Sequence, residues 1–190
     1  MAITRLNNNS ITSVTALPSG IDVGSMIKIS TTTISSQNTD ITLPTGYKFY
    51  KLFGSNVTLG GAGQTYDLYT TTNSFSSTDT DLEGSVSFQR VEDGTTGNDT
   101  ADGFLRLANN MSNDPTDNLS FEITLTDLTI SRPTGYNIFG FSIYGHTNDQ
   151  QSYRYILGAR SQTSSVVNGI RVRSSTASNN NGTIVLYGIN

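Results

Sequence analysis

Leu119-Ser120-Phe121-Glu122-Ile123-Thr124-Leu125-Thr126 is the most regular stretch of the chain, because apolar residues hold every second position. Side chains of a β-strand alternate between its two faces, so this stretch predicts a strand with one buried face and one wet face. Residues 84–90 alternate in the same way, with Val86 and Phe88 on one face. Both stretches therefore indicate half-buried antiparallel strands.

Similar short runs, bounded by turn residues, recur along the rest of the chain. They lie at residues 26–29, 40–43, 47–53, 65–71, 84–90, 104–107, 119–125, 138–144, 153–157, 169–173 and 183–187. In the run 138–144, Phe139, Phe141 and Ile143 share one face. Polar loops are expected at residues 60–64, 72–83, 92–103, 108–118 and 174–182.

The runs together predict an all-β protein. No window of ten residues or more has a helical period, and turn signals recur every 8–15 residues. This spacing predicts an antiparallel β-sandwich or jelly roll of about ten short strands over residues 25–190.

The composition agrees with a strand-rich domain and narrows the chemistry. Ser, Thr and Asn supply 70 of the 190 residues, and charged residues supply only 14%. The chain has no cysteine, which excludes disulfides, thiol nucleophiles and thiolate metal sites. The net charge of −4 disfavours a nucleic-acid partner, since phosphate contacts need a basic face. No signal peptide and no transmembrane-length apolar run are visible, so we expect no membrane partner.

Residues 1–24 differ from the rest of the chain. Their apolar residues are scattered without a period, and Pro18, Gly20 and Gly24 interrupt any helix or strand. We interpret this segment as an extended arm that becomes ordered against a partner chain, with a disordered leader as the alternative. The expected anchoring residues are Arg5, Leu6, Ile11, Val14, Leu17, Ile21 and Val23.

No catalytic constellation is visible. The chain has one histidine, His146, and sequence alone does not bring it to Asp149 and Ser152. The three glutamates, Glu83, Glu92 and Glu122, do not form a recognisable pair for sugar cleavage. We therefore expect no enzymatic activity, no catalytic residue and no cofactor.

Acidic residues gather at 79–102 without completing a metal motif. Asp79-x-Asp81-x-Glu83-Gly84 resembles the first half of a calcium loop, but Arg90 stands where a bidentate Glu is needed. We expect solvated carboxylates and no metal ion. The alternative, an ion held in a loop between strands, stays open.

Two further groups are candidates for contacts with other molecules. Arg171 and Arg173 alternate with apolar residues and share the outward face of one strand. Such a pair can bind carboxylates across a subunit contact or can protect a solvated edge. Flat aromatic side chains that can contact a glycan are Tyr66, Tyr69, Tyr153 and Tyr155, for which packing in the core or an interface is the alternative.

The two ends of the chain carry a resemblance. Thr4-Arg5-Leu6-Asn7-Asn8-Asn9-Ser10-Ile11, with Leu17-Pro18-Ser19-Gly20-Ile21-Asp22-Val23-Gly24, resembles the leader of structural proteins of tailed bacteriophages of marine and cyanobacterial type. Gly182-Thr183-Ile184-Val185-Leu186-Tyr187-Gly188-Ile189 is similar to the last strand of small jelly-roll modules on phage heads and tails. Between these ends the likeness is one of composition only.

The resemblance implies a non-enzymatic virion protein, assembled in the host cytoplasm. It implies a capsid decoration or head fibre that forms a homo-oligomer, often a trimer, and binds the major capsid protein or another virion protein. The alternative is a tail-fibre or receptor-binding module that recognises host surface glycan. The family has no catalytic residues to transfer to this chain.

Overall fold

The computed structural model describes residues 26–78, 80–114, 116–126, 136–146, 151–161, 165–175 and 180–190. All regular structure in these residues is β-strand, which confirms the predicted all-β class. This part of the chain contains no helix long and apolar enough to cross a membrane. The predicted arm, residues 1–24, lies outside the described residues.

The described residues form twelve strands, where the sequence predicted about ten. They are β1 (Ile27–Ile34), β2 (Asn38–Thr42), β3 (Phe49–Thr58), β4 (Gln64–Thr71), β5 (Leu82–Arg90), β6 (Thr96–Asp102), β7 (Leu105–Met111), β8 (Asn118–Thr126), β9 (Tyr136–His146), β10 (Gln151–Ser161), β11 (Gly169–Ser174) and β12 (Asn181–Ile189). Eleven of the strands overlap the eleven apolar runs, and Thr96–Asp102 is the additional one.

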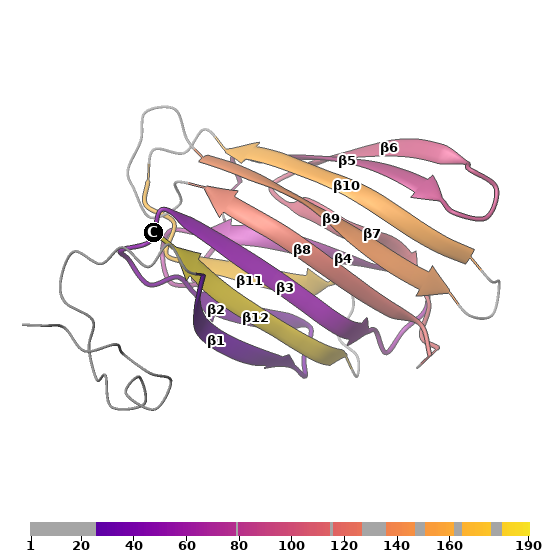
Figure 1. The fold of residues 1–190 in the computed structure, drawn as a ribbon, viewed down its shortest axis with the longest axis horizontal. Coiled ribbons are helices and arrows are strands. Elements are labelled where there is room, and N and C mark those ends of the chain that lie inside the picture. Colours follow the sequence, from indigo (N-terminus) through magenta and orange to yellow (C-terminus); the bar gives the residue numbers. More distant parts are fainter. Residues whose placement is uncertain are drawn as a thin grey trace, which may run out of the picture.

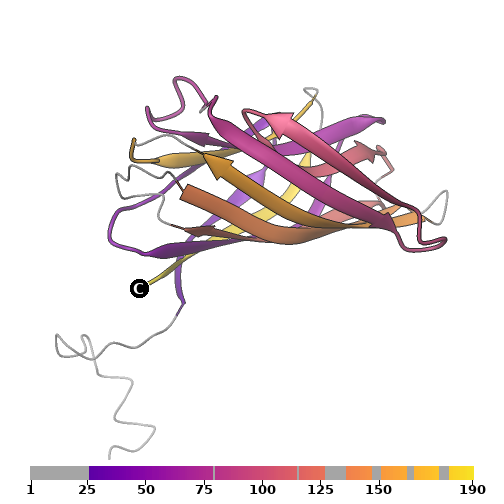
Figure 2. The same ribbon diagram turned by 90° about the horizontal axis from the view of Figure 1, so that it is seen from above.

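The strands form two antiparallel sheets. The eight-stranded sheet has the order β1-β12-β3-β8-β9-β10-β5-β6, and the four-stranded sheet has the order β2-β11-β4-β7. Figure 1 looks onto the eight-stranded sheet, and Figure 2, turned by 90°, shows the two layers of the sandwich. The predicted β-sandwich is therefore confirmed.

Eight of the strands pair as a nested set. β1 pairs with β12, β2 with β11, β3 with β8 and β4 with β7, as in one long hairpin that has been rolled up. The rolled hairpin places β1-β12-β3-β8 in one sheet and β2-β11-β4-β7 in the other. This arrangement is a jelly roll.

Two hairpins are added to the jelly roll. The β5–β6 hairpin lies between β4 and β7 in the chain, and the β9–β10 hairpin lies between β8 and β11. Both hairpins extend the eight-stranded sheet beyond β8. Their inner face is covered mainly by β7, which contacts β5, β9 and β10. The extended sheet therefore overhangs its narrower partner.

The stretch with the most regular alternation forms β8, in the middle of the extended sheet. Leu119, Phe121, Ile123 and Leu125 are at most 3% exposed and lie in the core between the sheets. Glu122 faces outward and forms an ion pair with Lys51 of β3. The period-two pattern thus identified the buried face of this strand correctly.

Strand β6 corrects the prediction of a loop at residues 92–103. Its sequence, Thr-Gly-Asn-Asp-Thr-Ala-Asp, has no apolar alternation, and none of its residues is buried. It is an edge strand that pairs only with β5 among the described strands. Asp99 also accepts a hydrogen bond from Arg106 of β7, at 2.8 Å, which ties this edge to the other sheet. Backbone pairing with β5 and one ion pair to β7 therefore hold β6 in place, without burial of its side chains.

Candidate functional site on the outer face of the eight-stranded sheet

Strand β9 turns its most apolar face toward solvent. Phe139 is 52% exposed, Phe141 is 51% exposed and Ile143 is 53% exposed. The alternate positions, which point into the sandwich, hold the small residues Gly140 and Ser142 between larger ones. A strand of an isolated sandwich would be expected to have the reverse arrangement, since burial of apolar surface drives folding.

Hydrogen bonds to β7 explain the polar inner positions. Ser142 Oγ donates to the carbonyl oxygen of Leu107 at 2.5 Å. The phenol oxygen of Tyr144 accepts from the backbone N–H of Ser112, just beyond β7, at 2.6 Å. β7 is an edge strand, so one of its sides faces no neighbouring strand in the described part of the chain. Buried backbone groups need partners, and the hydroxyls on the inner face of β9 supply them.

The outward side chains of neighbouring strands line up in rows across the sheet. Directly opposed residues of antiparallel strands share a face and lie about 5 Å apart. One row crosses all eight strands and consists of Thr31, Val185, Phe53, Glu122, Phe141, Ile156, Ser87 and Asn98. The adjacent row consists of Lys28, Tyr187, Lys51, Thr124, Phe139, Gly158, Ser85 and Thr100.

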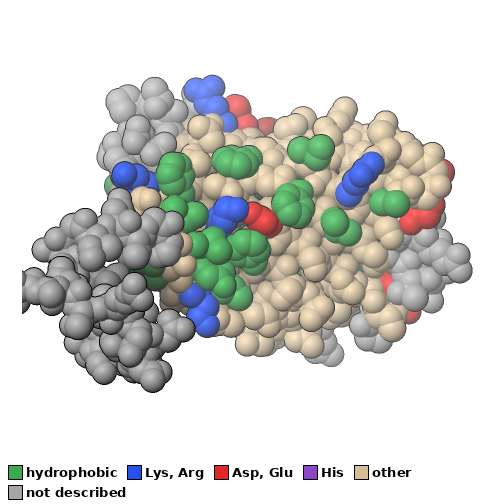
Figure 3. Space-filling view, viewed as in Figure 1, with side chains coloured by type: hydrophobic (Ala, Val, Ile, Leu, Met, Phe, Trp, Pro, Cys, Tyr) green, Lys and Arg blue, Asp and Glu red, His purple; other side chains and the backbone are tan. Residues whose placement is uncertain are grey.

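These rows place a band of apolar side chains over the sheet. We call it the apolar band, and it consists of Phe53, Phe139, Phe141, Ile143, Ile156, Val185 and Tyr187. Figure 3 shows hydrophobic side chains spread across this face, dense over one side of the sheet and separated toward the other. Ile156 is the most exposed of them, at 72%. Phe53 and Tyr187 meet edge to face, with ring centroids 5.6 Å apart.

One ion pair lies within the apolar band. The Lys51 ammonium contacts the Glu122 carboxylate across β3 and β8, and both side chains are about one-third exposed. Lys51 Nζ also lies 5.9 Å from the centroid of the Phe53 ring. The two charges cancel each other within one chain, so the centre of the band carries no net charge.

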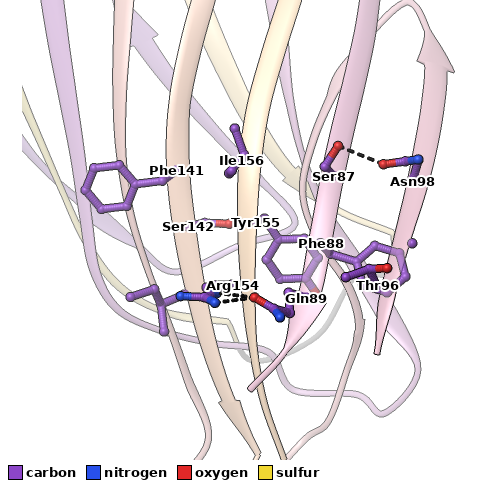
Figure 4. A pocket seen from close by; sticks show the side chains of 12 residues that line it. Ser87, Phe88, Gln89, Thr96, Asn98, Phe141, Ser142, Arg154, Tyr155 and Ile156 are labelled. Carbon is purple, nitrogen blue, oxygen red and sulfur yellow. Dashed lines mark hydrogen bonds between the residues drawn. The ribbon is translucent and has the colours of Figure 1, made fainter. Parts of the chain in front are cut away.

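A hollow of about 500 Å³ opens beside the band, over β5, β6, β9 and β10. Phe141 and Ile156 lie on its apolar side (Figure 4), and Ile143 also lines it. Its polar side contains two hydrogen-bonded pairs. Arg154 Nε donates to Gln89 Oε1 at 2.8 Å, and Ser87 Oγ donates to Asn98 Oδ1 at 2.7 Å.

A second hollow, of about 420 Å³, adjoins the first along β5 and β10. Ser87 and Ile156 line both hollows. Gly158 lines the second, and a Cβ built on it would meet nothing within 4 Å. The face therefore combines protruding apolar side chains with hollows left by Gly and Ser.

Arg171 and Arg173 both lie on the outer face of the four-stranded sheet, as their alternation predicted. Arg171 is used within the chain, because its Nε and Nη2 donate to Asp40 Oδ1 and Oδ2 at 2.6 and 2.8 Å. The hydrogen bonds to Asp40 raise the pKa of this guanidinium. Arg173 is exposed two residues further along β11. That either residue contacts another subunit stays a prediction.

The tyrosines proposed for glycan contact are divided between core and surface. Tyr66 and Tyr155 are buried, and Tyr69 and Tyr153 are partly exposed. Burial raises the pKa of Tyr66 and raises that of Tyr155 to about 12. Tyr69 packs against Phe104 on the outer face of the four-stranded sheet, with ring centroids 5.5 Å apart. The structure does not bring the four phenols together.

The acidic residues that the structure describes in segment 79–102 do not form one cluster. Thr80, Asp81, Glu83 and Asp102 line one hollow, whereas Asp99 binds Arg106 and Asp93 binds Arg90. Among the described residues, no three His, Asp or Glu side chains are grouped in a way that could hold a metal ion.

Other predicted sites fall partly outside the described residues. Asp79, Asp149 and the anchoring residues of the arm, from Arg5 to Val23, lie outside them. His146 ends β9, but its side chain is not among those described. Of the three glutamates, Glu122 pairs with Lys51, and Glu92 Oε1 accepts the backbone N–H of Ser152 at 2.5 Å.

The alternation of residues 138–144 predicts that Phe139, Phe141 and Ile143 share one face, but it does not show that this face is exposed. The available signal was the pair Gly140 and Ser142 on the opposite face, because these residues are too polar and too small for the buried face of a core strand.

Comparison of the chain with protein-family models, with curated proteins and with solved structures found no match.

Proposed function

We propose that the protein is a non-enzymatic structural component of a tailed-phage particle, acting as a capsid decoration or head fibre. The arm, residues 1–24, would attach it to the major capsid protein or another virion protein. The sandwich would bind its own copies, a trimer being the assembly that the resemblance implies. The support comes from the likeness of the two chain ends to phage structural proteins and from the surface of the sandwich.

The apolar band is the observation that carries this proposal. Four of its members, Phe139, Phe141, Ile143 and Ile156, are each more than half exposed on one face. With side chains of about 200 Å² each, they present about 400 Å² of apolar surface before the rest of the band is added. An apolar patch of this size is about the largest that a soluble monomer exposes, and such patches are often functional. A protein whose work is assembly needs such a face.

The test is to look for the chain in purified particles of the phage that encodes it. Mass spectrometry of the particles should detect the protein in stoichiometric amounts. Immunogold electron microscopy should place it on the head, where a tail position would favour the fibre alternative. Absence of the chain from washed particles would overturn the proposed function.

A second candidate function is recognition of a host surface glycan, and the hollow of about 500 Å³ favours it. Its volume is that of a small-ligand site, and its lining combines the Phe141 ring with the hydrogen-bonding groups of Arg154, Gln89 and Asn98. Jelly rolls also include lectin domains.

Titration calorimetry with purified host lipopolysaccharide tests this second function. Binding that is weakened in Arg154→Ala and unchanged in Arg90→Ala would support it, because Arg90 pairs with Asp93 outside the hollow. No heat of binding at high micromolar protein would count against it.

A further inference from the structure

We infer that the apolar band and its two hollows bind a second copy of this chain, face to face. This inference rests on the proposed structural function and names the partner of the same face. The size of the face, its charges and its relief each support a second copy as the partner.

The face has the dimensions of a stable protein interface. Eight strands spaced about 4.8 Å apart make the sheet roughly 35 Å wide, and strands of seven to eleven residues are on average roughly 30 Å long. The outer face therefore measures roughly 1,000 Å². A stable interface takes about 800 Å² from each partner, so one sheet face is enough. Sheets also pack on each other face to face, about 10 Å apart, as a standard arrangement.

The charges on the face allow two identical faces to meet. A face of one sign would repel its own copy, since like charges in juxtaposition are costly. Here the Lys51 ammonium and the Glu122 carboxylate neutralise each other at the centre. Near the rim, Arg160 lies opposite Glu83 in the β10–β5 register, again with opposite signs. An anionic membrane surface would instead call for an excess of basic residues.

The face has both protruding side chains and hollows, so its shape is complementary to that of the same face on a second copy. Phe139 and Phe141 stand out from β9, while Gly158, Ser85 and Ser87 leave hollows over the neighbouring strands. Closely packed interfaces need protruding side chains to fill recesses. Because one chain carries both protrusions and recesses on the same face, each copy can fill the hollows of the other. This match favours a second copy over an unrelated protein.

Light scattering of the full chain over a dilution series is the first test. We expect a mass of two chains of 20.4 kDa or an even multiple of that, because a face that packs on its own copy closes as a two-fold pair. A mass of three chains would support the trimer implied by the resemblance and would overturn the face-to-face contact. A mass of one chain at about 100 µM, far above the dissociation constant of a stable assembly, would overturn the inference. A monomer that binds host glycan in the hollow would overturn it in favour of recognition.

Ile156→Lys tests whether this face makes the contact. Ile156 is 72% exposed and points away from the core, so the sandwich should keep its far-ultraviolet circular dichroism. A charge placed in the centre of the interface should weaken self-association by about 30-fold or more. Val91→Lys is the matched control, because Val91 is 56% exposed in the turn after β5, outside the band. Equal association constants for the two variants would overturn the inference.

Cysteine labelling gives a readout that does not depend on the Ile156 variant. The chain has no cysteine, so a single introduced thiol is labelled without background. Ser85→Cys places the thiol beside Gly158 on the face, and Thr42→Cys places it at an exposed position of β2 in the other sheet. At assembling concentrations, maleimide should react with Ser85→Cys about tenfold more slowly than on dilution, with no change for Thr42→Cys. Concentration-independent labelling of both variants would overturn the inference.

These tests separate the inference from the proposed function. If the chain assembles in solution but is missing from phage particles, the face-to-face contact is supported and the proposed virion function is overturned. If the chain is present in particles but monomeric in solution at every concentration, the proposed virion function is supported and the face-to-face contact is overturned.

Discussion

At the scale of single residues, the tyrosines of the core differ in how their hydroxyls are satisfied. The Tyr136 hydroxyl shares a hydrogen bond with Thr70 Oγ1, and the Tyr50 hydroxyl donates to the carbonyl of Pro44. The Tyr66 hydroxyl is buried and has no hydrogen-bond partner in the described part of the chain. A buried polar group without a partner loses its hydration and gains nothing in return.

Tyr66→Phe is therefore expected to stabilise the protein. Removal of the unpartnered hydroxyl should raise the free energy of unfolding by about 1 kcal/mol, since the ring keeps its place in the core. Tyr136→Phe is the control, because it breaks the bond to Thr70 and should lower stability by about the same amount. Urea unfolding of both variants measures the two effects. A loss of stability in Tyr66→Phe would contradict the prediction.

Asp67 is expected to make the free energy of unfolding depend on pH in the acidic range. Burial is the largest influence on its pKa and raises it above the ordinary value of 3.8, against the opposing attraction of Arg106. The folded state thus binds the Asp67 proton more tightly than the unfolded chain does. The stabilisation from this group is complete below pH 3.8 and is lost as the pH rises through the folded pKa.

The prediction is tested by comparing the unaltered protein with its Asp67→Asn variant by urea unfolding, from about pH 3 to about pH 7. The stability advantage of the unaltered protein over the variant should be greatest in acid and should decline as the pH rises. An advantage that instead grows toward neutral pH would show that the ion pair with Arg106 outweighs burial.

At the scale of elements, several strand glycines leave room for an aromatic ring. A Cβ on Gly54 of β3 would collide with the ring of Phe121 in β8, and one on Gly188 would collide with Tyr47. Phe121 is only 3% exposed and is held in the core. The glycines therefore set how closely these strands and rings approach, which composition alone does not reveal.

Gly54→Ala and Gly158→Ala form a matched pair of substitutions. Gly54→Ala should lower the free energy of unfolding by about 2 kcal/mol, because the added methyl group overpacks the core at Phe121. Gly158→Ala should change it by no more than about 0.5 kcal/mol, because the space there is open. Thermal or urea unfolding compares them. Equal effects would mean that β3 shifts to accept the methyl group.

At the scale of the whole molecule, the described strands from Ile27 to Ile189 complete the jelly roll without residues 1–24. Deletion of residues 1–24 should therefore leave the circular dichroism and melting temperature of the sandwich unchanged. If the arm attaches the protein to particles, the shortened chain should no longer bind them in a co-sedimentation assay. The full chain is the positive control. Unfolding of the shortened chain would instead show that the arm belongs to the core.

The sequence by itself determined the fold class and the main strands. Period-two alternation at residues 119–126 and the lack of any helical period favoured an antiparallel sandwich or jelly roll, because a pleated strand in a two-layer protein buries only one of its faces. Alternation is a local property of the sequence, so it predicts a strand regardless of which other strands pair with it. Where a strand lacked it, as in β6, the sequence predicted a loop.

Only the tertiary structure decided which face of β9 is buried. Both faces are compatible with a strand, and hydrophobicity alone would have placed Phe139, Phe141 and Ile143 inside. The two inserted hairpins widen one sheet beyond the other, and β7 meets the overhanging strands as the edge of the narrower sheet. Its backbone groups draw Ser142 and Tyr144 inward, so the apolar side chains face out. That outcome depends on contacts between segments about thirty residues apart, which no local pattern records.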